Sequence, residues 1–347
     1  KWYAKSSGTT SERSKYIPVS RVNLKQCHIK GSWDSVAMLY NNIPTARVFA
    51  DKSLIMGGSL EKFKPHPDTT IGDVSAVMLA NMPLIGRPFT SPNLETALLD
   101  DWEEKIERMS KEAIKENITM FGGVPTWTIV LFRRILEMTG KDNMFEVWPN
   151  AQLYMHGGVA FEPYREQFKR FFPSDKFLYQ EVYNASEGFF GLQDDLSSDD
   201  MLLMLDYGVF YEFIPMKDWN SDNPRVISIE DVELGENYAI VISTSAGLWR
   251  YKIGDTVKFT SIKPYKIKIT GRTKHFINAF GEEVIIDNAD KALNKACQIT
   301  GAEVSEYTAA PVFMKDGNSG KHQWLIEFST QPESLEYFTE ILDNTLK

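Results

Sequence analysis

The chain has 347 residues, of which 43% are hydrophobic and 24% are charged, so it can build one large domain or two unequal ones around a sizeable core. The formal net charge of −9 argues against a protein that binds nucleic acid along a broad basic surface, so any phosphate site must be local. Cys27 and Cys297 match no metal-binding spacing, and no apolar run approaches the ~20 residues of a membrane span. We therefore expect a cytoplasmic protein that acts on small molecules, with neither nucleic acid nor membrane as a partner.

Both ends of the sequence lie inside predicted elements. The chain opens on a strand-like run at residues 2–4 and closes on a helical pattern over residues 335–346 that has no Gly or Pro stop. We therefore expect it to be part of a longer protein.

A loop rich in hydroxyl side chains, Ser6-Ser7-Gly8-Thr9-Thr10-Ser11, follows the first strand-like run. Hydroxyls and backbone N–H groups in a tight turn donate hydrogen bonds to anionic oxygens, and Gly8 lets the backbone come close. Lys15 can add a compact positive charge for the outer phosphates of a nucleotide. The spacing is not that of a Walker loop, and the alternative interpretation is a Ser/Thr-rich surface turn beside a solvated lysine.

Helices and strands alternate through the first half of the chain. The pattern predicts a mixed helix over residues 22–40 and a strand over residues 46–56. A long helix is expected from Ser91-Pro92, with apolar residues at three- and four-residue steps. Pro125 opens another helix, residues 127–138, that is apolar nearly all round. Core packing is the usual explanation of its aromatic residues, and lining of a ligand pocket is the alternative.

A strand–helix–strand unit follows. The predicted strand at residues 151–155 ends in His156-Gly157-Gly158, a helix covers residues 162–172, and a second strand at residues 177–183 ends in residues 184–188. Ligands collect beyond the carboxyl ends of strands in such units, so His156 is the one of the five histidines that we expect near a ligand.

The predicted secondary structure changes twice in the remaining part of the chain. Residues 202–269 contain short strands and turns with no helical period, and Gly271-Arg272-Thr273-Lys274 separates them from a tail with a helix, two strands and a last helix. We predict an α/β large domain over residues 1–271, with a β-rich annex at residues 196–271, and a truncated α+β cap domain over residues 272–347.

Three further motifs have the composition of ligand sites. Glu187, preceded by Ser186 and Tyr183, could hold Mg²⁺ against phosphate oxygens while the tyrosine ring stacks on a base. Asp255, at a predicted Gly-Asp turn, could accept both hydroxyls of a ribose. Arg272, at the predicted domain boundary, could touch a ligand between the domains. The alternatives are a solvated glutamate, a plain turn aspartate and an exposed interdomain arginine.

The order of these motifs along the chain resembles the adenylate-forming superfamily, which includes firefly luciferase and acyl-CoA synthetases. Three segments are similar to the nucleotide motifs of one branch, the auxin-responsive Gretchen Hagen acyl-acid amido synthetases of plants and their bacterial relatives. They are Ser6-Ser7-Gly8-Thr9-Thr10, Tyr183-Asn184-Ala185-Ser186-Glu187-Gly188-Phe189-Phe190-Gly191 and Tyr251-Lys252-Ile253-Gly254-Asp255. The resemblance spans nearly the whole chain.

The resemblance implies a role for each motif residue. The opening loop and Lys15 would hold the β- and γ-phosphates of ATP, and His156-Gly157-Gly158-Val159 would wall the adenine. Tyr183 would stack on that base, Ser186 would contact the α-phosphate or the acyl carboxylate, and Glu187 would hold Mg²⁺. Asp255 would bind the ribose hydroxyls, and Arg272 would reach the nucleotide at the hinge. Lys15, Ser186 and Glu187 are thus the expected catalytic residues.

The sequence departs from the family pattern in places. Glu12 brings a carboxylate next to the opening loop, and Asn184 replaces a common glycine. The family's catalytic lysine is expected beyond Lys347, which favours ATP binding with poor adenylation by these residues alone.

The reaction that the resemblance implies is a ligase reaction in two halves. A carboxylic acid is adenylated by Mg·ATP, and an amine, expected to be an amino acid, then displaces AMP to form an amide. The alternatives are an acyl-CoA synthetase and a nucleotide-binding protein without catalytic activity.

Overall fold

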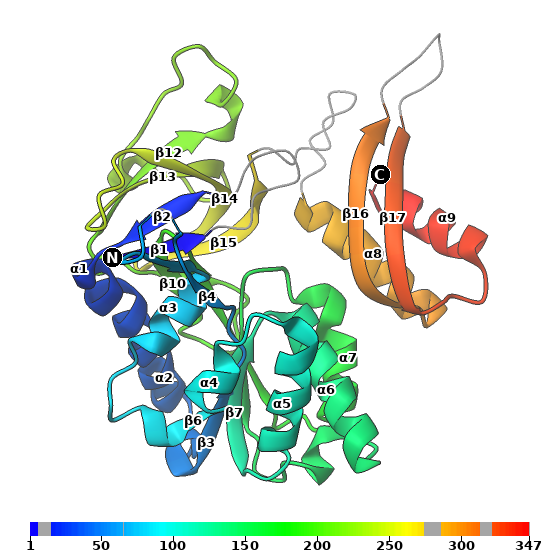
Figure 1. The fold of residues 1–347 in the computed structure, drawn as a ribbon. Helices are drawn as coiled ribbons and strands as arrows, with labels where there is room; N and C mark the ends of the chain where they lie inside the picture. The colour runs from blue at the N-terminus through cyan, green and yellow to red at the C-terminus, as the bar shows by residue number, and fades with distance from the viewer. Residues whose placement is uncertain (6–14, 65, 274–285, 313–320, 347) are drawn as a thin grey trace.

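The protein was analysed as a computed structural model that describes residues 1–5, 15–64, 66–273, 286–312 and 321–346 (Figure 1). Within these residues an eleven-stranded mixed sheet runs through the large part of the molecule, and a four-stranded sheet lies beside it. The order in the large sheet is β12 (Val209–Pro215), β13 (Asn237–Thr244), β14 (Tyr251–Ile262), β15 (Tyr265–Arg272), β11 (Met201–Leu203), β10 (Gly188–Leu192), β9 (Leu178–Ala185), β8 (Leu153–His156), β7 (Ile118–Gly123), β3 (Lys52–Ile55) and β6 (Thr90–Ser91). The order in the smaller sheet is β2 (Tyr16–Val19), β1 (Trp2–Lys5), β5 (Thr70–Gly72) and β4 (Leu60–Lys62).

The large sheet changes character at β9. From β9 to β6 the neighbouring strands are parallel, whereas from β9 to β12 they are all antiparallel. The predicted strand–helix–strand unit is therefore confirmed as β8, α7 (Arg165–Phe171) and β9, and the β-rich annex is the antiparallel half. The β9–β10 hairpin joins the two halves, and its turn carries Ser186 and Glu187.

Helices cover both faces of the parallel half. On one face, α5 (Trp102–Ala113), α6 (Pro125–Thr139) and α7 pack on an aromatic core that includes Phe121 and Tyr154. On the other face, α2 (Lys30–Asn42) packs against Met120 and Leu153. The remaining α-helices of the large part are α1 (Arg21–Asn23), α3 (Val74–Ala80) and α4 (Leu94–Ala97).

Local sequence explains where α6 begins and ends. Pro125 lies in its first turn, where a missing N–H costs nothing, and Gly140 ends it with φ 63°, in the left-handed region that glycine adopts without strain. Its Phe132 is fully buried in the core, whereas Trp127 is partly exposed and lines a cavity. Both explanations of its aromatic residues therefore hold, for different residues.

Three predicted elements differ in the structure. The helix expected from Ser91-Pro92 is two helices, because Asn93 caps α4 by accepting from Thr96 N at 3.0 Å and Asp101 caps α5 by accepting from Glu104 N at 2.8 Å. The strand predicted at residues 46–56 contains a 3₁₀ turn at Val48–Ala50, and β3 begins only at Lys52.

The third difference concerns the Gly-Asp motif. Where short strands and turns are expected from the sequence, one strand, β14, runs from Tyr251 through Ile262 with a change of register between Thr256 and Val257. Asp255 therefore lies within a strand, opposite Arg272 of β15, and not at a turn.

A small α+β unit follows, as the sequence predicts. Helices α8 (Ile286–Thr300) and α9 (Leu335–Leu346) pack against β16 (Glu303–Val312) and β17 (Lys321–Thr330). Gln167 of α7 donates to the Val304 carbonyl at 3.0 Å, and Arg170 pairs with Glu303 at 2.7 Å. The small unit is thereby attached to the large part at the end of α7. A division of the chain at residue 271 stays a prediction.

Candidate active site

A cavity of about 1380 Å³ lies where the two halves of the large sheet and the small unit meet. Its lining includes every candidate site residue that the structure describes: Lys15, His156, Gly157, Gly158, Val159, Tyr183, Ser186, Glu187, Asp255 and Arg272. Residues 6–11 of the opening loop lie outside the described residues. The folding of distant segments thus brings the described motif residues to one cavity.

Lys15 stands at the edge of this cavity, directly before β2. Its Nζ lies 5.9 Å from the centre of the Tyr251 ring, the first residue of β14. A lysine within about 6 Å of a tyrosine ring is held by a weak cation–π attraction and keeps most of its hydration. The ammonium is therefore placed between the opening segment and the motif that contains Asp255.

Tyr183, Asp255 and Arg272 form a connected group on the cavity wall. The Tyr183 hydroxyl donates to Asp255 Oδ2 at 2.6 Å, and Arg272 Nε pairs with Asp255 Oδ1 at 3.1 Å. Arg272 also donates from Nη2 to the Ile253 carbonyl at 3.3 Å. Burial raises the pKa of Asp255, while the Tyr183 hydrogen bond and the Arg272 charge act in the opposite direction. Donors on both oxygens make this carboxylate a fixed, oriented acceptor.

Glu187 occupies the turn between β9 and β10. Its side chain is 7% exposed although it carries a carboxyl group. Burial raises the pKa of Glu187, the nearby Asp255 charge raises it further, and Arg272 lowers it. Two carboxyl groups therefore share the field of one guanidinium, an arrangement that favours a further cation.

Among the described residues, no group of three or more His, Cys, Asp or Glu side chains is placed to hold a metal ion. No helix in the described part of the chain is long and apolar enough to cross a membrane.

His156 ends β8 with its ring buried. The ring stacks on Phe161 with 4.1 Å between centroids, and burial lowers the pKa of His156 to about 3. Its Nδ1 has no hydrogen-bond partner within the described residues. A Cβ on Gly157 would lie 2.3 Å from the Val182 carbonyl, so only glycine allows the segment to pass this close to β9. Gly158, with φ 86°, then turns the chain along the cavity.

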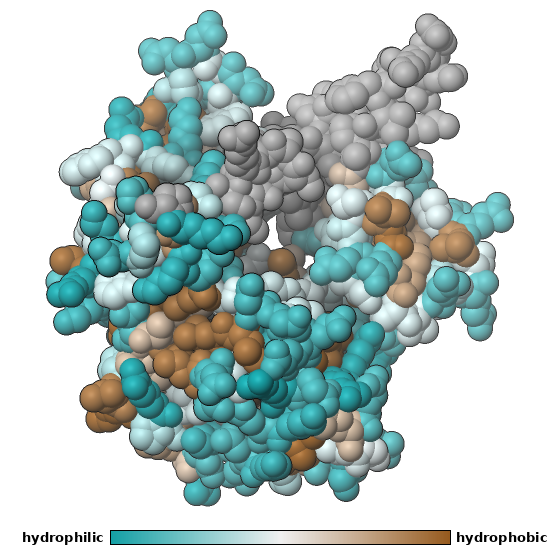
Figure 2. Space-filling view, in the orientation of Figure 1, coloured by the Kyte–Doolittle hydropathy of each residue, from teal (hydrophilic) through white to brown (hydrophobic). Residues whose placement is uncertain are grey.

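One side of the cavity is apolar, and no motif in the sequence predicts it. We call it the apolar arm, and it is lined by side chains from α2, α3, the segment after α3 and the ends of β3, β7 and β8. They include Trp33, Met56, Met78, Leu79, Met82 and Phe89. Phe89 and Ile85 also reach the molecular surface, so the arm opens there, and Figure 2 shows hydrophobic residues gathered in the region of α3 and α4. A four-residue step between Met78 and Met82 was the available signal, but it equally describes a core helix.

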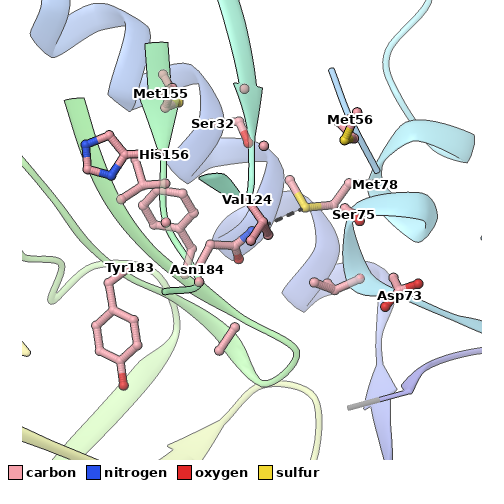
Figure 3. Close-up of a pocket in the computed structure, with 18 of the residues that line it drawn as sticks. Ser32, Met56, Asp73, Ser75, Met78, Val124, Met155, His156, Tyr183 and Asn184 are labelled. Atoms are coloured by element: carbon pink, nitrogen blue, oxygen red, sulfur yellow. Dashed lines mark hydrogen bonds between the residues drawn. The ribbon is translucent and has the colours of Figure 1, made fainter. Parts of the chain in front are cut away.

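Two further sets of lining residues were also missed. Asn184 projects from β9 between Tyr183 and Met78 (Figure 3). The small unit contributes Asp290, Glu306 and Tyr307, and the Tyr307 hydroxyl donates to Asp290. Burial raises the pKa of Glu306. No sequence pattern placed these acidic residues at the same cavity, because they follow the predicted domain boundary.

The same overall fold is found in solved structures of ligases. The structure is similar to GH3.15 acyl acid amido synthetase, with a TM-score of 0.77 and 16% identity over 99% of this chain and 69% of that one. It is also similar to 2-hydroxyisobutyryl-CoA ligase in its postadenylation state. The TM-score is 0.62 and the identity 13%, over 97% of this chain and 66% of that one.

The chain belongs to the GH3 family. Models of the GH3 family N-terminal, central and C-terminal domains match residues 1–177 in two overlapping segments, residues 202–272 and residues 287–347. The predicted resemblance to the Gretchen Hagen branch is thereby confirmed.

Curated relatives from plants are similar over part of the chain. Indole-3-acetic acid-amido synthetase GH3.3 of Arabidopsis thaliana is 25% identical over 219 residues, which are 58% of this chain and 36% of the relative. Jasmonoyl–L-amino acid synthetase JAR4 of Nicotiana attenuata is 34% identical over 122 residues, which are 33% of this chain and 20% of the relative. The chain thus matches about a third or less of these relatives' length.

Proposed function

We propose that this protein is an ATP-dependent acyl-acid amido synthetase. In the first half-reaction, a carboxylate oxygen of the acid attacks the α-phosphorus of ATP, the bond to the bridging oxygen breaks, and pyrophosphate leaves. In the second, the nitrogen of an amino acid attacks the acyl carbon, AMP leaves, and the nitrogen loses a proton. The names of the curated relatives, amido synthetases for indole-3-acetic acid and for jasmonate, support this assignment.

The single observation that carries the proposal is the convergence of two family motifs and Lys15, which follows the third motif, at one cavity with an apolar arm. Lys15, Glu187 and Asp255 come from parts of the chain more than 60 residues apart and all line it. A nucleotide needs donors for phosphate and an acceptor for ribose, and an acid substrate needs an apolar space beside them. The cavity offers these three environments together.

The phosphate side of the proposal rests on Lys15, the opening loop, Ser186 and Glu187. Lys15 and the loop hydroxyls would donate to the β- and γ-phosphates, and Ser186 would face the α-phosphate or the acyl carboxylate. Glu187 would hold Mg²⁺, which when bound neutralises charge on the phosphate oxygens. The remaining contribution of the protein is positioning, because the acid and the α-phosphate must be held within reach of each other.

The nucleoside side rests on the oriented Asp255. One of its oxygens accepts the Tyr183 hydrogen bond and the other is ion-paired with Arg272, and each carboxylate oxygen has a further lone pair for a ribose hydroxyl. Segment 156–159 and Tyr183 would flank the adenine, with Arg272 beside the ribose or the α-phosphate. The neutral His156 adds no charge to this wall, as suits a neutral base.

The small unit supplies the third part of the proposal. Residues 272–347 would act as a cap domain over the large domain of residues 1–271. Asp290 and Glu306 make its side of the cavity acidic. A cytoplasmic location is part of the proposal too, supported by Cys27 and Cys297, which are both unpaired.

The decisive experiment is pyrophosphate release by the full-length protein across a panel of carboxylic acids, followed by a panel of amino acids. Acid-dependent pyrophosphate release and amide formation would establish the function. Product formation only with coenzyme A would replace it with thioester synthesis. ATP binding without pyrophosphate release for any acid would indicate a nucleotide-binding protein without this activity.

A further inference from the structure

The apolar arm meets the nucleotide side of the cavity at Asn184. We propose that the Asn184 side-chain amide donates a hydrogen bond to the carboxylate of an apolar acid seated in the arm, and that buried His28 holds the amide in the required orientation. This inference rests on the proposed function and adds the chemistry by which the acid is oriented.

The hydrogen bond between His28 and Asn184 fixes the amide. His28 Nδ1 lies 3.1 Å from Asn184 Oδ1, and the His28 side chain is fully buried. Burial lowers the pKa of His28 to about 4, so the ring is neutral and has one N–H. The other ring nitrogen, Nε2, has no partner within the described residues.

The buried ring determines which nitrogen has the proton. A proton on Nε2 would leave a buried N–H donor unpaired, and such donors are rarer than unpaired acceptors. We therefore assign the proton to Nδ1, which donates to Asn184 Oδ1. The Asn184 NH₂ group then faces the cavity.

The NH₂ group has only a weak partner where it points. Its acceptor among the described residues is the Met78 thioether, with Nδ2 and Sδ 3.9 Å apart, and Figure 3 shows this contact across the cavity. A thioether sulfur is a weak acceptor, so a carboxylate oxygen in its place would gain a stronger, charge-assisted hydrogen bond. The geometry leaves a donor directed at the cavity.

The arm itself offers a carboxylate no ionic partner. The cationic side chains among the described lining residues are Lys5, Lys15 and Arg272, none of which belongs to the helices α2 and α3 that wall the arm. Acidic residues also line the cavity, among them Glu181, Glu187 and Asp255, so charge alone does not place the carboxylate. The donor that an apolar acid meets with its body in the arm is the Asn184 NH₂ group, where the arm reaches the motif residues.

The test compares an acid with its neutral amide. Binding of octanoate and octanamide, and of phenylacetate and phenylacetamide, is measured by calorimetry without ATP for the wild type and Asn184→Asp. The aspartate has the same shape but repels a carboxylate and accepts from an amide NH₂. The dissociation constant for the acids should rise at least about tenfold, and that for the amides should stay level or fall. ATP affinity should fall by a smaller factor than acid affinity.

Two further variants separate orientation from general damage. His28→Leu should weaken acid binding about threefold and reduce the preference for acid over amide, and His28→Gln, which can still donate to Asn184, should restore that preference. Asn223→Asp, the same charge change at an exposed residue, is the matched control and should change neither constant.

The outcomes distinguish this inference from the proposed function. An unchanged acid-to-amide ratio in folded Asn184→Asp would overturn it, as would a larger effect on ATP than on acid. No saturable binding of either acid to the wild type would also overturn it. Absence of pyrophosphate release with an intact acid-to-amide inversion would instead contradict the proposed function and leave Asn184 as an acid-binding residue.

Discussion

The Tyr183 hydroxyl and Asp255 are joined by a 2.6 Å hydrogen bond between the β9 end and the middle of β14. Two of the family motifs are therefore one structural unit, with the tyrosine ring 5% exposed and packed edge-on against Phe190. The hydroxyl orients the carboxylate, and Arg272 fixes its other oxygen. A substitution at any of the three residues should therefore alter the interactions of the other two.

Removing the Tyr183 hydroxyl tests this unit. The hydrogen bond lowers the pKa of Asp255, so in Tyr183→Phe that pKa should rise and more of the carboxyl group should be protonated as the pH falls. Affinity for ATP should decrease about 2- to 13-fold at pH 7, corresponding to ~0.5–1.5 kcal/mol, and by a larger factor at pH 5.5. Calorimetric titration with ATP at both pH values checks this, and a pH-independent loss would assign the effect to ring packing.

Asp255 itself should discriminate ribose from deoxyribose. Charge-assisted hydrogen bonds contribute about 1.5–3 kcal/mol each, so Asp255→Ala should raise the dissociation constant of ATP at least tenfold. The same variant should narrow the difference between ATP and 2′-deoxy-ATP. An unchanged preference for the ribose form would mean that other groups recognise the hydroxyls.

Glu187 should reveal its role through the magnesium dependence of the reaction. Glu187→Gln keeps the shape of the buried side chain but removes the charge that would attract a divalent cation. Activity should fall, with partial recovery at high Mg²⁺ and an unchanged circular dichroism spectrum. Wild-type activity at low Mg²⁺ would remove Glu187 from the site.

The fold class could be predicted from the order of the motifs through the family resemblance, and the ends of some elements could be predicted from local signals. Pro125 and Gly140 mark the ends of a helix by backbone conformation alone, and Gly157 marks a close approach of two segments. Such signals can be recognised in a sequence because each depends on a proline or glycine that few other residues can replace.

The features that the sequence did not predict depend on contacts between distant residues. Asp255 was placed at a turn because Gly254 precedes it, but pairing with β15 extends the strand through both. The His28–Asn184 pair joins residues 156 apart in sequence, and the helix that contains His28 gives no sign of it. The apolar arm was missed for the same reason, since Met78 and Met82 look alike in a core and in a pocket.

Buried His156 should make stability depend on pH. Its folded-state pKa of about 3 lies below the ordinary value of 6.5, so the unfolded chain binds more protons between these values. The stabilisation is complete above pH 6.5 and is lost as the pH falls toward 3. At pH 5 the loss should be ~2 kcal/mol relative to pH 7.

A variant isolates this contribution from other titrating groups. His156→Phe keeps an aromatic ring against Phe161 and cannot titrate. Urea unfolding at pH 7 and pH 5 should show a decrease in the free energy of unfolding that is ~2 kcal/mol smaller for the variant than for the wild type. Equal decreases would mean that His156 is hydrated and titrates normally in the folded protein.

Lys15 should separate the two half-reactions. Its position at the cavity edge, beside Tyr251, suits a grip on the pyrophosphate portion of ATP, which leaves after the first half-reaction. Loss of one preorganised donor typically costs about 10²–10³ in rate, so Lys15→Ala in the full-length protein should slow pyrophosphate release by that factor. Supplied with synthetic acyl-AMP, the same preparation should form amide at close to the wild-type rate.

Lys52→Ala is the matched control. The Nζ of Lys52 lies 4.0 Å from Glu116, and Lys52 is not among the residues that line the cavity, so its loss should affect neither half-reaction. Equal losses in both halves would show that Lys15 supports the fold or the acceptor site, and no loss in either would return it to a solvated surface lysine.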